Sequence, residues 1–317
     1  MRLPWIINGV RIPAVFLAVI FVRLTATAAV PGFELRTNDV IAFVGGEDVV
    51  EMQRNGYLEL LLTAAKPELN LRFRSLAFEG DTVFEQHRQL NFPSSEQQLE
   101  SLGATVVIAQ FGQAEMLSGP GGPAEFLGAY EKLLARFTNG GRRLVLLSPT
   151  PIENSQGSQL AFDPVDCVGA IAQFALRRGH HFVELTDELS PRRNGQMQTR
   201  DGIHLNAAGQ WKAARVTAKS MVPSALSNRA ARIQPNGTLN EPGLEAIRRI
   251  IMEKNRFWFD YWRPQNWAFL KGDRIDQPSS HDHRDPKKRW FPQEMEKFRP
   301  MIEAKEREIW KLAAALR

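Results

Sequence analysis

The stretch VIAFVGGEDVV, residues 40–50, has the form of a buried strand that runs directly into a glycine turn. Five apolar residues come first, followed by Gly45 and Gly46 and then by the acidic residue Glu47. α/β enzymes often place a nucleophile at such a turn, where a strand gives way to a helix. In this chain the exposed position of the turn carries a carboxylate and not a hydroxyl group.

Four more apolar runs follow this strand, and amphipathic helical patterns separate them. The expected strands are 40–46, 71–77, 104–112, 142–149 and 181–186, and the expected helices of this region are 51–65, 123–137, 163–179 and 206–221. Strands and helices that alternate with short connections form a parallel sheet covered on both faces. The pattern therefore predicts an α/β protein, a three-layer α/β/α sandwich whose functional residues lie at the carboxyl ends of the strands.

Composition and charge are those of an ordinary globular protein. The chain has 317 residues, of which 43% are hydrophobic and 24% charged, and its net charge is +5. We expect no nucleic-acid partner, since the densest cationic cluster, 284–290, is best explained as a solvated surface. The single cysteine, Cys167, lies on an apolar helical face and excludes an intramolecular disulfide. The histidines of HDHRD (281–285) lack a third ligand, so we expect neither a metal site nor another cofactor.

The N-terminal residues have the order of a secretory signal. Arg2 and Arg11 precede the apolar run 12–22, and small residues at 25–29 offer a cleavage site. The run is too short for a comfortable membrane span, so we expect no stable transmembrane anchor; an uncleaved N-terminal anchor is the second interpretation. The sequence therefore predicts a signal peptide over residues 1–29 and export to the periplasm or the extracellular space.

The composition changes again in the C-terminal third. We expect an α/β domain over 30–226, a polar, turn-rich linker over 227–243, and an aromatic-rich helical extension over 244–317. Packing of this extension on the α/β domain is the simpler interpretation. The alternative is a lid over the active site, because aromatic rings beside polar side chains suit a sugar or an aromatic ester. The polar candidates for such a lid are Asn255, Arg263 and Asn266.

The string TRDGIHLNAAGQ (199–210) carries the clearest chemical signal. Asp201 and His204 lie three residues apart in a glycine-containing turn before an expected helix, so both side chains can face one pocket. A carboxylate can fix the tautomer of an imidazole while the other ring nitrogen acts as a base. The spacing alone is also typical of an ordinary turn with a capping aspartate, and the whole string is much more specific.

DGIHLNAAGQ (201–210) resembles the last motif block of the SGNH (GDSL-type) hydrolases, esterases with a flavodoxin-like α/β/α core. The resemblance extends over roughly residues 38–222 in matching strand order. It implies a flavodoxin-like, five-stranded parallel sheet and hydrolysis of esters. It also implies that His204 is the catalytic histidine and Asp201 its partner.

The other motif blocks of the family are present in altered form. FVGGEDVV (43–50) lies where the family has Gly-Asp-Ser, AFEGDTV (77–83) matches the second block, and FGQAE (111–115) lies where the family has Gly-x-Asn-Asp. Glu47 thus occupies the position of the nucleophilic serine, and Ala114 that of the oxyanion-hole asparagine. The resemblance assigns these further residues to the oxyanion hole or the pocket: Gly45, Gly46, Gly80, Gly112, Gln113 and Glu115.

Three roles for Glu47 stay open. It can be a carboxylate nucleophile, it can act with His204 as a base on water, or it can pair with His204 or bind ligand in a catalytically dead site. The first function is therefore an esterase-like hydrolase with an atypical or impaired site, acting on acylated carbohydrate or another small ester. The second is an inactive binding module, a pseudoenzyme, for carbohydrate or another small ligand. The sequence names neither the substrate nor the oligomeric state.

Overall fold

A computed structural model describes residues 33–119, 121–153, 160–223 and 231–316. These residues belong to one compact unit, Gly32–Arg317. The predicted signal peptide, residues 1–29, lies outside the described residues. Among the helices of the described ranges, none combines the length and the apolar character needed to cross a membrane.

A five-stranded parallel sheet forms the centre of the unit, in the order β2-β1-β3-β4-β5. The strands are Val40–Gly45 (β1), Arg72–Ser75 (β2), Val106–Gln110 (β3), Arg143–Leu147 (β4) and His181–Val183 (β5). Gly45 lies opposite Gln110, and Gln110 lies opposite Leu147, so β1, β3 and β4 end at the same level. The predicted flavodoxin-like sheet is confirmed, and each strand is shorter than its apolar run in the sequence.

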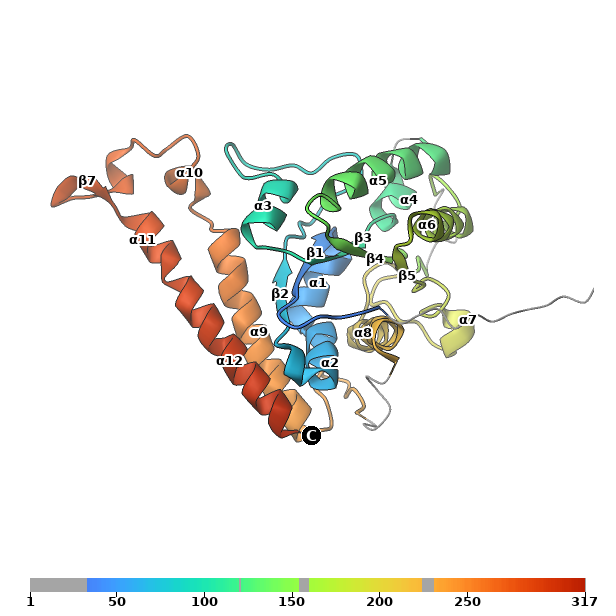
Figure 1. Cartoon of the computed structure of the whole chain (residues 1–317). Helices are drawn as coiled ribbons and strands as arrows, with labels where there is room; N and C mark the ends of the chain where they lie inside the picture. Colours follow the sequence, from blue (N-terminus) through green and yellow to red (C-terminus); the bar gives the residue numbers. More distant parts are fainter. Residues whose placement is uncertain (1–32, 120, 154–159, 224–230, 317) are drawn as a thin grey trace, which may run out of the picture. The chain divides into compact units, whose positions relative to one another are not determined.

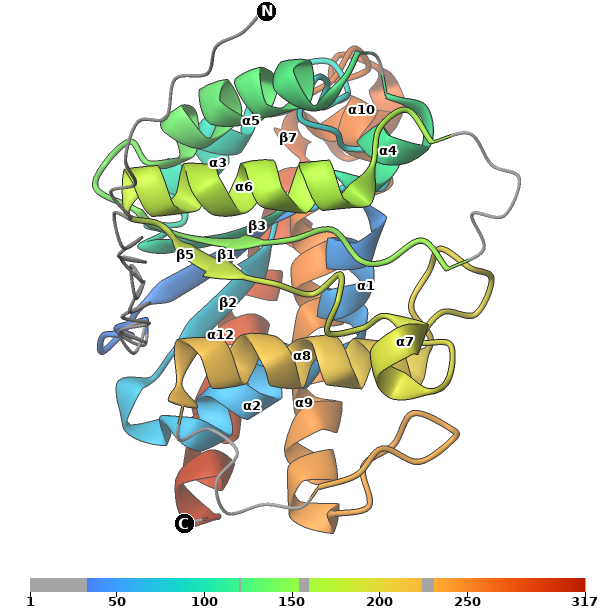
Figure 2. The ribbon, with the colours of Figure 1, turned by 90° about the vertical axis from the view of Figure 1, so that its right-hand side faces the viewer.

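Helices cover both faces of this sheet (Figure 2). One face carries Ser95–Ser101 (α3), Pro123–Phe137 (α5) and Pro164–Arg178 (α6), and the other carries Glu47–Asn55 (α1), Tyr57–Ala65 (α2) and Ala207–Met221 (α8). Side chains alternate along β1, so this strand contributes to the hydrophobic cores on both faces of the sheet. Ile41 and Phe43 pack toward α1, α2 and α8, while Ala42 and Val44 pack toward the opposite face. The predicted three-layer sandwich is thereby confirmed. Shorter elements are Pro67–Leu69 (η1), Gln113–Ser118 (α4) and Pro191–Asn194 (α7).

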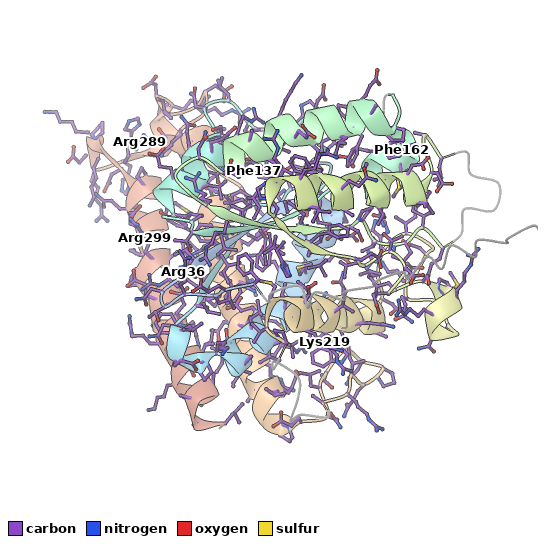
Figure 3. All side chains as sticks on the ribbon, turned by 45° about the vertical axis from the view of Figure 1, so that its right-hand side comes forward. Arg36, Phe137, Phe162, Lys219, Arg289 and Arg299 are labelled. Carbon is purple, nitrogen blue, oxygen red and sulfur yellow. The ribbon has the colours of Figure 1, made fainter. Side chains whose placement is uncertain are left out.

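The core beneath α5 and α6 is aromatic. Phe137 and Phe162, labelled in Figure 3, belong to it and lie toward opposite ends of this layer. The ring of Phe126 lies 5.6 Å from that of Tyr130 and 5.7 Å from that of Phe162, measured between ring centroids. Cys167 is buried in the same cluster, and burial raises the pKa of its thiol to about 12. It is therefore a core thiol and not a nucleophile.

Two expected helices are divided in the structure. The pattern over 51–65 becomes α1 and α2, because Gly56 adopts a left-handed φ of 67° between them. Within the expected helical extension, the charged residues 293–316 have an apolar stripe at helical spacing, and they become Trp290–Glu296 (α11) and Phe298–Ala315 (α12), with a break at Lys297. Hydrophobic periodicity alone did not reveal either break, since the apolar face resumes on both sides.

The C-terminal extension packs beside β2, the edge strand of the sheet (Figure 1). It consists of Pro242–Trp262 (α9), Trp267–Leu270 (α10), Pro278–Ser280 (η3), the ribbon His281–Asp282 (β6) and Asp285–Arg289 (β7), and the helices α11 and α12. α9 and α12 run side by side in opposite directions (Figure 1). The indole N–H groups of Trp258 and Trp310 donate to the carbonyl oxygens of Ser75 (2.7 Å) and Leu71 (3.0 Å). The tail is thus joined to the α/β body by its tryptophans.

Candidate active site

The turn between β1 and α1 brings Glu47 to the carboxyl end of the sheet. Gly45 has a φ of 152°, and a Cβ atom there would lie 2.4 Å from a backbone carbonyl oxygen of β3, so glycine is required. Gly46 occupies the N-cap of α1, and a Cβ atom there would lie 3.1 Å from the carbonyl oxygen of Asp81. Glu47 is half-buried in the first helical turn, with its Oε1 atom 3.9 Å from Nη1 of Arg54.

The second motif block lies directly against this turn. Gly80, with a φ of 84°, is exposed after β2, and its neighbour Asp81 is buried. The two carboxylate oxygens of Asp81 accept hydrogen bonds from Arg88 at 2.6 and 2.8 Å. Since the backbone of Asp81 also approaches Gly46, the structure brings the first two blocks together.

The third block is held by a buried carboxylate. The oxygens of Glu115 accept the backbone N–H groups of Gly112 (2.8 Å) and Val83 (2.7 Å), and burial raises the pKa of Glu115. Gly112 adopts a left-handed φ of 119°, and a Cβ atom there would lie 3.1 Å from the sulfur of Cys167. Glu115 therefore shapes this turn by accepting backbone hydrogen bonds, and its place in the oxyanion hole or the pocket stays a prediction.

Gln113 also has a structural engagement. Its Nε2 atom donates to Oγ1 of Thr150 (2.5 Å) and to the carbonyl oxygen of Ile203 (3.1 Å). An amide nitrogen has two hydrogens, so both are used. Gln113 thus contacts Ile203, the residue directly before His204. In this conformation its side chain has no N–H group left for an oxyanion. Ala114 has no side-chain donor either.

His204 and Asp201 are joined by a short contact. Oδ2 of Asp201 lies 2.6 Å from Nδ1 of His204, and Oδ1 accepts the backbone N–H groups of His204 (2.7 Å) and Ile203 (3.0 Å). The hydrogen bonds from the backbone and the ring of His204 hold the pKa of Asp201 well below its usual range. The proton then lies on Nδ1, and no residue in the described ranges hydrogen-bonds Nε2, which is left as the basic nitrogen.

The loop that carries this dyad is fixed from two sides. Glu153, after β4, accepts the backbone N–H groups of Gln198 (2.7 Å) and Thr199 (2.9 Å) and the hydroxyl group of Thr199. Arg200 forms an ion pair with Glu51 of α1 at 2.8 Å. The dyad is therefore held against segments that follow both β4 and β1.

Asp48, which the sequence reasoning did not single out, is the most perturbed carboxylate near the dyad. Its side chain is 8% exposed; Oδ2 accepts from Oγ1 of Thr150 (2.5 Å), and Oδ1 is buried with no hydrogen-bond partner among the described residues. Burial, followed by the charges of Glu51 and Glu47, raises the pKa of Asp48 to about 6, although Thr150 and His204 oppose the rise.

A sequence signal for Asp48 did exist. It lies four residues before Met52, so the two share one helical face, and Met52 is buried. An acidic residue on the buried face of a helix that begins at a glycine turn is an indicator of a functional carboxylate.

The proposed lid residue Asn255 has a different position from the one expected. It is buried, and its side-chain amide donates to the carbonyl oxygen of Gln53 (2.9 Å), while the amide of Gln53 donates to the carbonyl oxygen of Asn255 (3.2 Å). This reciprocal pair joins α9 to α1. Asn255 is therefore a packing residue, which fits the simpler interpretation of the extension and not a lid role for this side chain.

The other two lid candidates lie at the end of α9 and after it. Arg263 donates from Nη1 to Oε2 of Glu79 at 2.7 Å, and Oε1 of Glu79 accepts from Arg54 at 2.9 Å. Because Arg54 also lies 3.9 Å from Glu47, a chain of ion pairs connects the tail to the first motif block. Asn266 precedes α10, and its side chain makes no capping hydrogen bond there.

Among the described residues around the strand ends, Ser148 is not placed as a nucleophile and no metal cluster is found. Ser148, at the end of β4, is fully buried, and its Oγ atom accepts the backbone N–H groups of Leu185 (2.7 Å) and Thr186 (3.1 Å). Within the described ranges, no group of three or more His, Cys, Asp or Glu side chains is arranged to hold a metal ion.

No protein-family model matches this chain, and a comparison with curated proteins finds no match in sequence. Several solved structures do resemble it. A catalytic mutant of Axe2, an acetylxylan esterase from Geobacillus stearothermophilus, matches with a TM-score of 0.51 and 14% identity, over 62% of this chain and 100% of that chain.

Two further structures have lower TM-scores. LAE5, an alpha/beta hydrolase enzyme from the metagenome of Lake Arreo in Spain, has a TM-score of 0.47 and 18% identity, over 61% of this chain and 98% of that chain. A gut microbial diltiazem-metabolizing enzyme has a TM-score of 0.48 and 14% identity, over 60% of this chain and 48% of its own, so this chain spans about half its length. The α/β body thus shares the fold of the Axe2 acetylxylan esterase, in agreement with the core that the resemblance to SGNH hydrolases implies.

Proposed function

We propose that the protein is an esterase-like hydrolase whose base is His204, oriented by Asp201. The observation that carries this proposal is the 2.6 Å contact between Nδ1 of His204 and Oδ2 of Asp201, which leaves Nε2 to face a substrate. The loop of this dyad is bonded to segments that follow β1, β3 and β4. Enzymes with open α/β sheets bind their ligands at that edge.

Since Glu47 stands in place of serine, water is the nucleophile in this proposal. Nε2 of His204 takes a proton from the water molecule while the water oxygen bonds to the ester carbonyl carbon. The tetrahedral adduct then breaks its bond to the alkoxide, which takes the proton from the imidazolium. A carboxylic acid and an alcohol are released, and His204 returns to its neutral form. Asp201, which is ionised, stabilises the imidazolium between the two steps.

Glu47 assists on the same water molecule. No ion pair within 4.0 Å joins Glu47 to His204 among the described side chains, and Glu47 lies 3.9 Å from Arg54 instead. The carboxylate of Glu47 lies near a cation and is not bound to the imidazole of His204, so it can accept a hydrogen bond from water. This favours joint action of Glu47 and His204 over a closed Glu47–His204 pair.

The missing oxyanion donor favours a second function, an inactive module that binds a carbohydrate or another small ligand. The third block offers no free side-chain donor, since Ala114 has none and the amide of Gln113 is bound to Thr150 and Ile203. Loss of one such donor lowers catalytic rates by about 10²–10³. In this alternative the same edge of the sheet binds a ligand and does not hydrolyse it.

For the substrate we propose acylated carbohydrate or another small ester, in line with the fold shared with an acetylxylan esterase. We also propose that the protein acts outside the cytoplasm, because Arg2, Arg11 and the apolar run 12–22 have the order of an export signal. We propose no nucleic-acid partner, given the mild net charge of +5.

Hydrolysis assays on the purified full chain test the proposal. Release of acetate from acetylated xylo-oligosaccharides and of nitrophenol from short nitrophenyl esters should exceed the uncatalysed rate, and His204→Ala should abolish the excess. His87→Ala is the matched control, because His87 is exposed and contacts Glu85. A folded wild type without turnover on the whole panel, or activity that survives His204→Ala, would reject the hydrolase. Calorimetric binding of the same sugars without turnover would then favour the binding module.

A further inference from the structure

A large groove runs along β2, between the α/β body and the C-terminal extension. Its walls come from β2, α3, α9, α10 and α12, and its volume is about 1330 Å³. Pockets for small molecules commonly enclose about 300–1,000 Å³. The groove is therefore large enough for an extended ligand, and none of the described residues of the 199–210 segment lines it.

Aromatic side chains form much of the lining, and they come from two parts of the chain. Phe92 precedes α3, and its ring lies 4.6 Å from that of Trp267 in α10. The rings of Trp258 and Trp262 in α9 are stacked, 6.3 Å apart with an interplanar angle of 11°. The half-buried rings of the lining, Phe92, Tyr261 and Trp310, rest on these buried tryptophans or beside them and offer flat apolar surfaces to a ligand. Such surfaces beside polar side chains are typical of sites for sugars, whose rings combine C–H faces with hydroxyl edges.

One indole N–H group in this lining has no hydrogen-bond acceptor among the described residues. The N–H groups of Trp258 and Trp267 donate to the backbone carbonyl oxygens of Ser75 (2.7 Å) and Leu90 (2.9 Å). Trp262 is only 6% exposed, yet its Nε1 atom has no hydrogen-bond partner among the described residues. A buried N–H group without a partner is costly, and an oxygen of a bound ligand would remove that cost.

Charge narrows the class of ligand. Five cationic side chains and three anionic ones line the groove. Arg74 is bound to Glu306 at 2.6 Å and Arg299 to Glu296 at 3.4 Å. The remaining cations include Lys271 and Arg307, which have no acidic partner within 4.0 Å in the described ranges. Figure 3 shows Arg299 on α12, the helix that forms the outer wall.

We propose that this groove is a second binding site, separate from the His204 dyad, for an oligosaccharide that bears carboxylate groups. The half-buried rings contact the sugar faces, the N–H group of Trp262 donates to a sugar oxygen, and Lys271 and Arg307 bind the carboxylates. The site does not depend on hydrolysis at His204.

The groove also has a physical connection to the candidate active site. The ring of Trp262 packs at 5.0 Å, between ring centroids, against that of Phe78, which belongs to the second motif block. Arg263, the next residue after Trp262, covers the same ring at 3.8 Å and binds Glu79. A polymer held in the groove would therefore lie beside the segment that ends at Gly80.

Isothermal titration calorimetry of the full chain tests this proposal. The probes are an oligogalacturonate of about five sugars and a neutral xylo-oligosaccharide of the same length. We expect binding of the acidic oligosaccharide that weakens when salt rises from about 50 to about 500 mM, and weaker binding of the neutral one. His204→Ala should leave this binding unchanged, which separates the groove from the hydrolase proposal.

Variants identify the site. Lys271→Gln and Arg307→Gln should each weaken binding of the oligogalacturonate by about three- to tenfold. Trp262→Phe keeps a ring and removes the N–H group, and it should weaken binding by about fivefold. Lys311→Gln is the control, because Lys311 is an exposed cation on α12 outside the groove. The lysine and arginine variants alter exposed side chains, so they test the proposal even if Trp262→Phe fails to fold.

Three results would overturn the proposal. The first is the absence of binding of the oligogalacturonate up to about 5 mM. The second is binding of the neutral oligosaccharide as tight as that of the acidic one. The third is binding that is unchanged in both Lys271→Gln and Arg307→Gln, or that is lost in His204→Ala.

Discussion

Asp201 binds His204 twice, through Oδ2 to the ring nitrogen Nδ1 at 2.6 Å and through Oδ1 to the backbone N–H at 2.7 Å. The second contact places the carboxylate, and the first orients the imidazole, so the geometry exists before any ligand binds. The same hydrogen bonds keep the pKa of Asp201 low, so the carboxylate stays ionised while the ring gains and loses a proton.

Asp201→Asn should therefore lower kcat by about 10²–10⁴ with little change in KM, because the amide favours the wrong ring tautomer and cannot stabilise the imidazolium. Steady-state kinetics on a short nitrophenyl ester measure both constants. Asp187→Asn is the control, since Asp187 is exposed and pairs with Arg193 at 2.8 Å. An unchanged kcat in Asp201→Asn would show that the dyad has only a structural role.

Substitutions of Glu47 distinguish a mechanism that uses its carboxylate from one that uses a serine hydroxyl group. If Glu47 assists on water, Glu47→Gln should lower kcat by about 10²–10⁴. The double variant Glu47→Ser with Ala114→Asn should instead hydrolyse through an acyl-enzyme, because it restores a hydroxyl group and an oxyanion donor at the family positions. A rapid burst of nitrophenol in stopped-flow traces of the double variant, absent from the wild type, is the measurement. A burst in the wild type would contradict the water mechanism and favour a carboxylate nucleophile.

Asp48 should make stability depend on pH. Its pKa is about 6 in the folded protein and 3.8 ordinarily, so the folded state binds the proton more tightly and the group destabilises the fold as pH rises from about 4 to about 6. The difference corresponds to about 3 kcal/mol. Asp48→Asn cannot ionise, so the free energy of unfolding of the variant relative to the wild type should rise over this interval and stay constant above it.

Urea unfolding at about pH 4, 5, 6 and 7 measures that difference, and the other carboxylates cancel between the two proteins. Asp187→Asn is the control for replacing an aspartate by asparagine at an exposed position. A difference between Asp48→Asn and the wild type that is the same at every pH would mean that Asp48 ionises normally.

Local chemistry explains what the sequence could predict. The strand-to-helix turn at Gly45 and the turn that joins Asp201 to His204 each depend on residues close in the chain, so their patterns indicate their geometry. The parallel three-layer arrangement follows from alternating strands and helices, and the flavodoxin-like sheet is what the resemblance to SGNH hydrolases implies. These parts of the fold are confirmed by the structure.

Long-range packing explains what the sequence did not predict. Thr150, which binds Asp48, is 102 residues away, and Gln53, which binds Asn255, is 202 residues away. No periodicity specifies such pairs, because each depends on how one helix docks on a distant segment. An exposed lid amide and a buried packing amide look the same in a sequence, and only the position of α9 against α1 distinguishes them.

The dependence of the tail on the α/β body can be tested at Lys254 of α9. Lys254 is fully buried, and its Nζ atom donates to Oε1 of Glu59 in α2 at 2.7 Å. Burial lowers the pKa of Lys254 and raises that of Glu59, so each charge depends on the other. Lys254→Met leaves the carboxylate of Glu59 buried without its partner and should lower the free energy of unfolding by about 3–5 kcal/mol.

The double variant Lys254→Met with Glu59→Leu removes both buried charges, so it should recover most of that loss. Urea unfolding of the wild type, the two single variants and the double variant gives the coupling energy directly. Lys305→Gln is the control, because Lys305 pairs with the partly exposed Glu253 at 2.9 Å and should change stability by less than about 1 kcal/mol. Additive effects of the two substitutions would show that α9 does not depend on Glu59. A strong coupling, together with one unfolding transition, would show that the tail and the α/β body fold as a single cooperative unit, and that a chain cut before α9 loses the partner of a buried carboxylate.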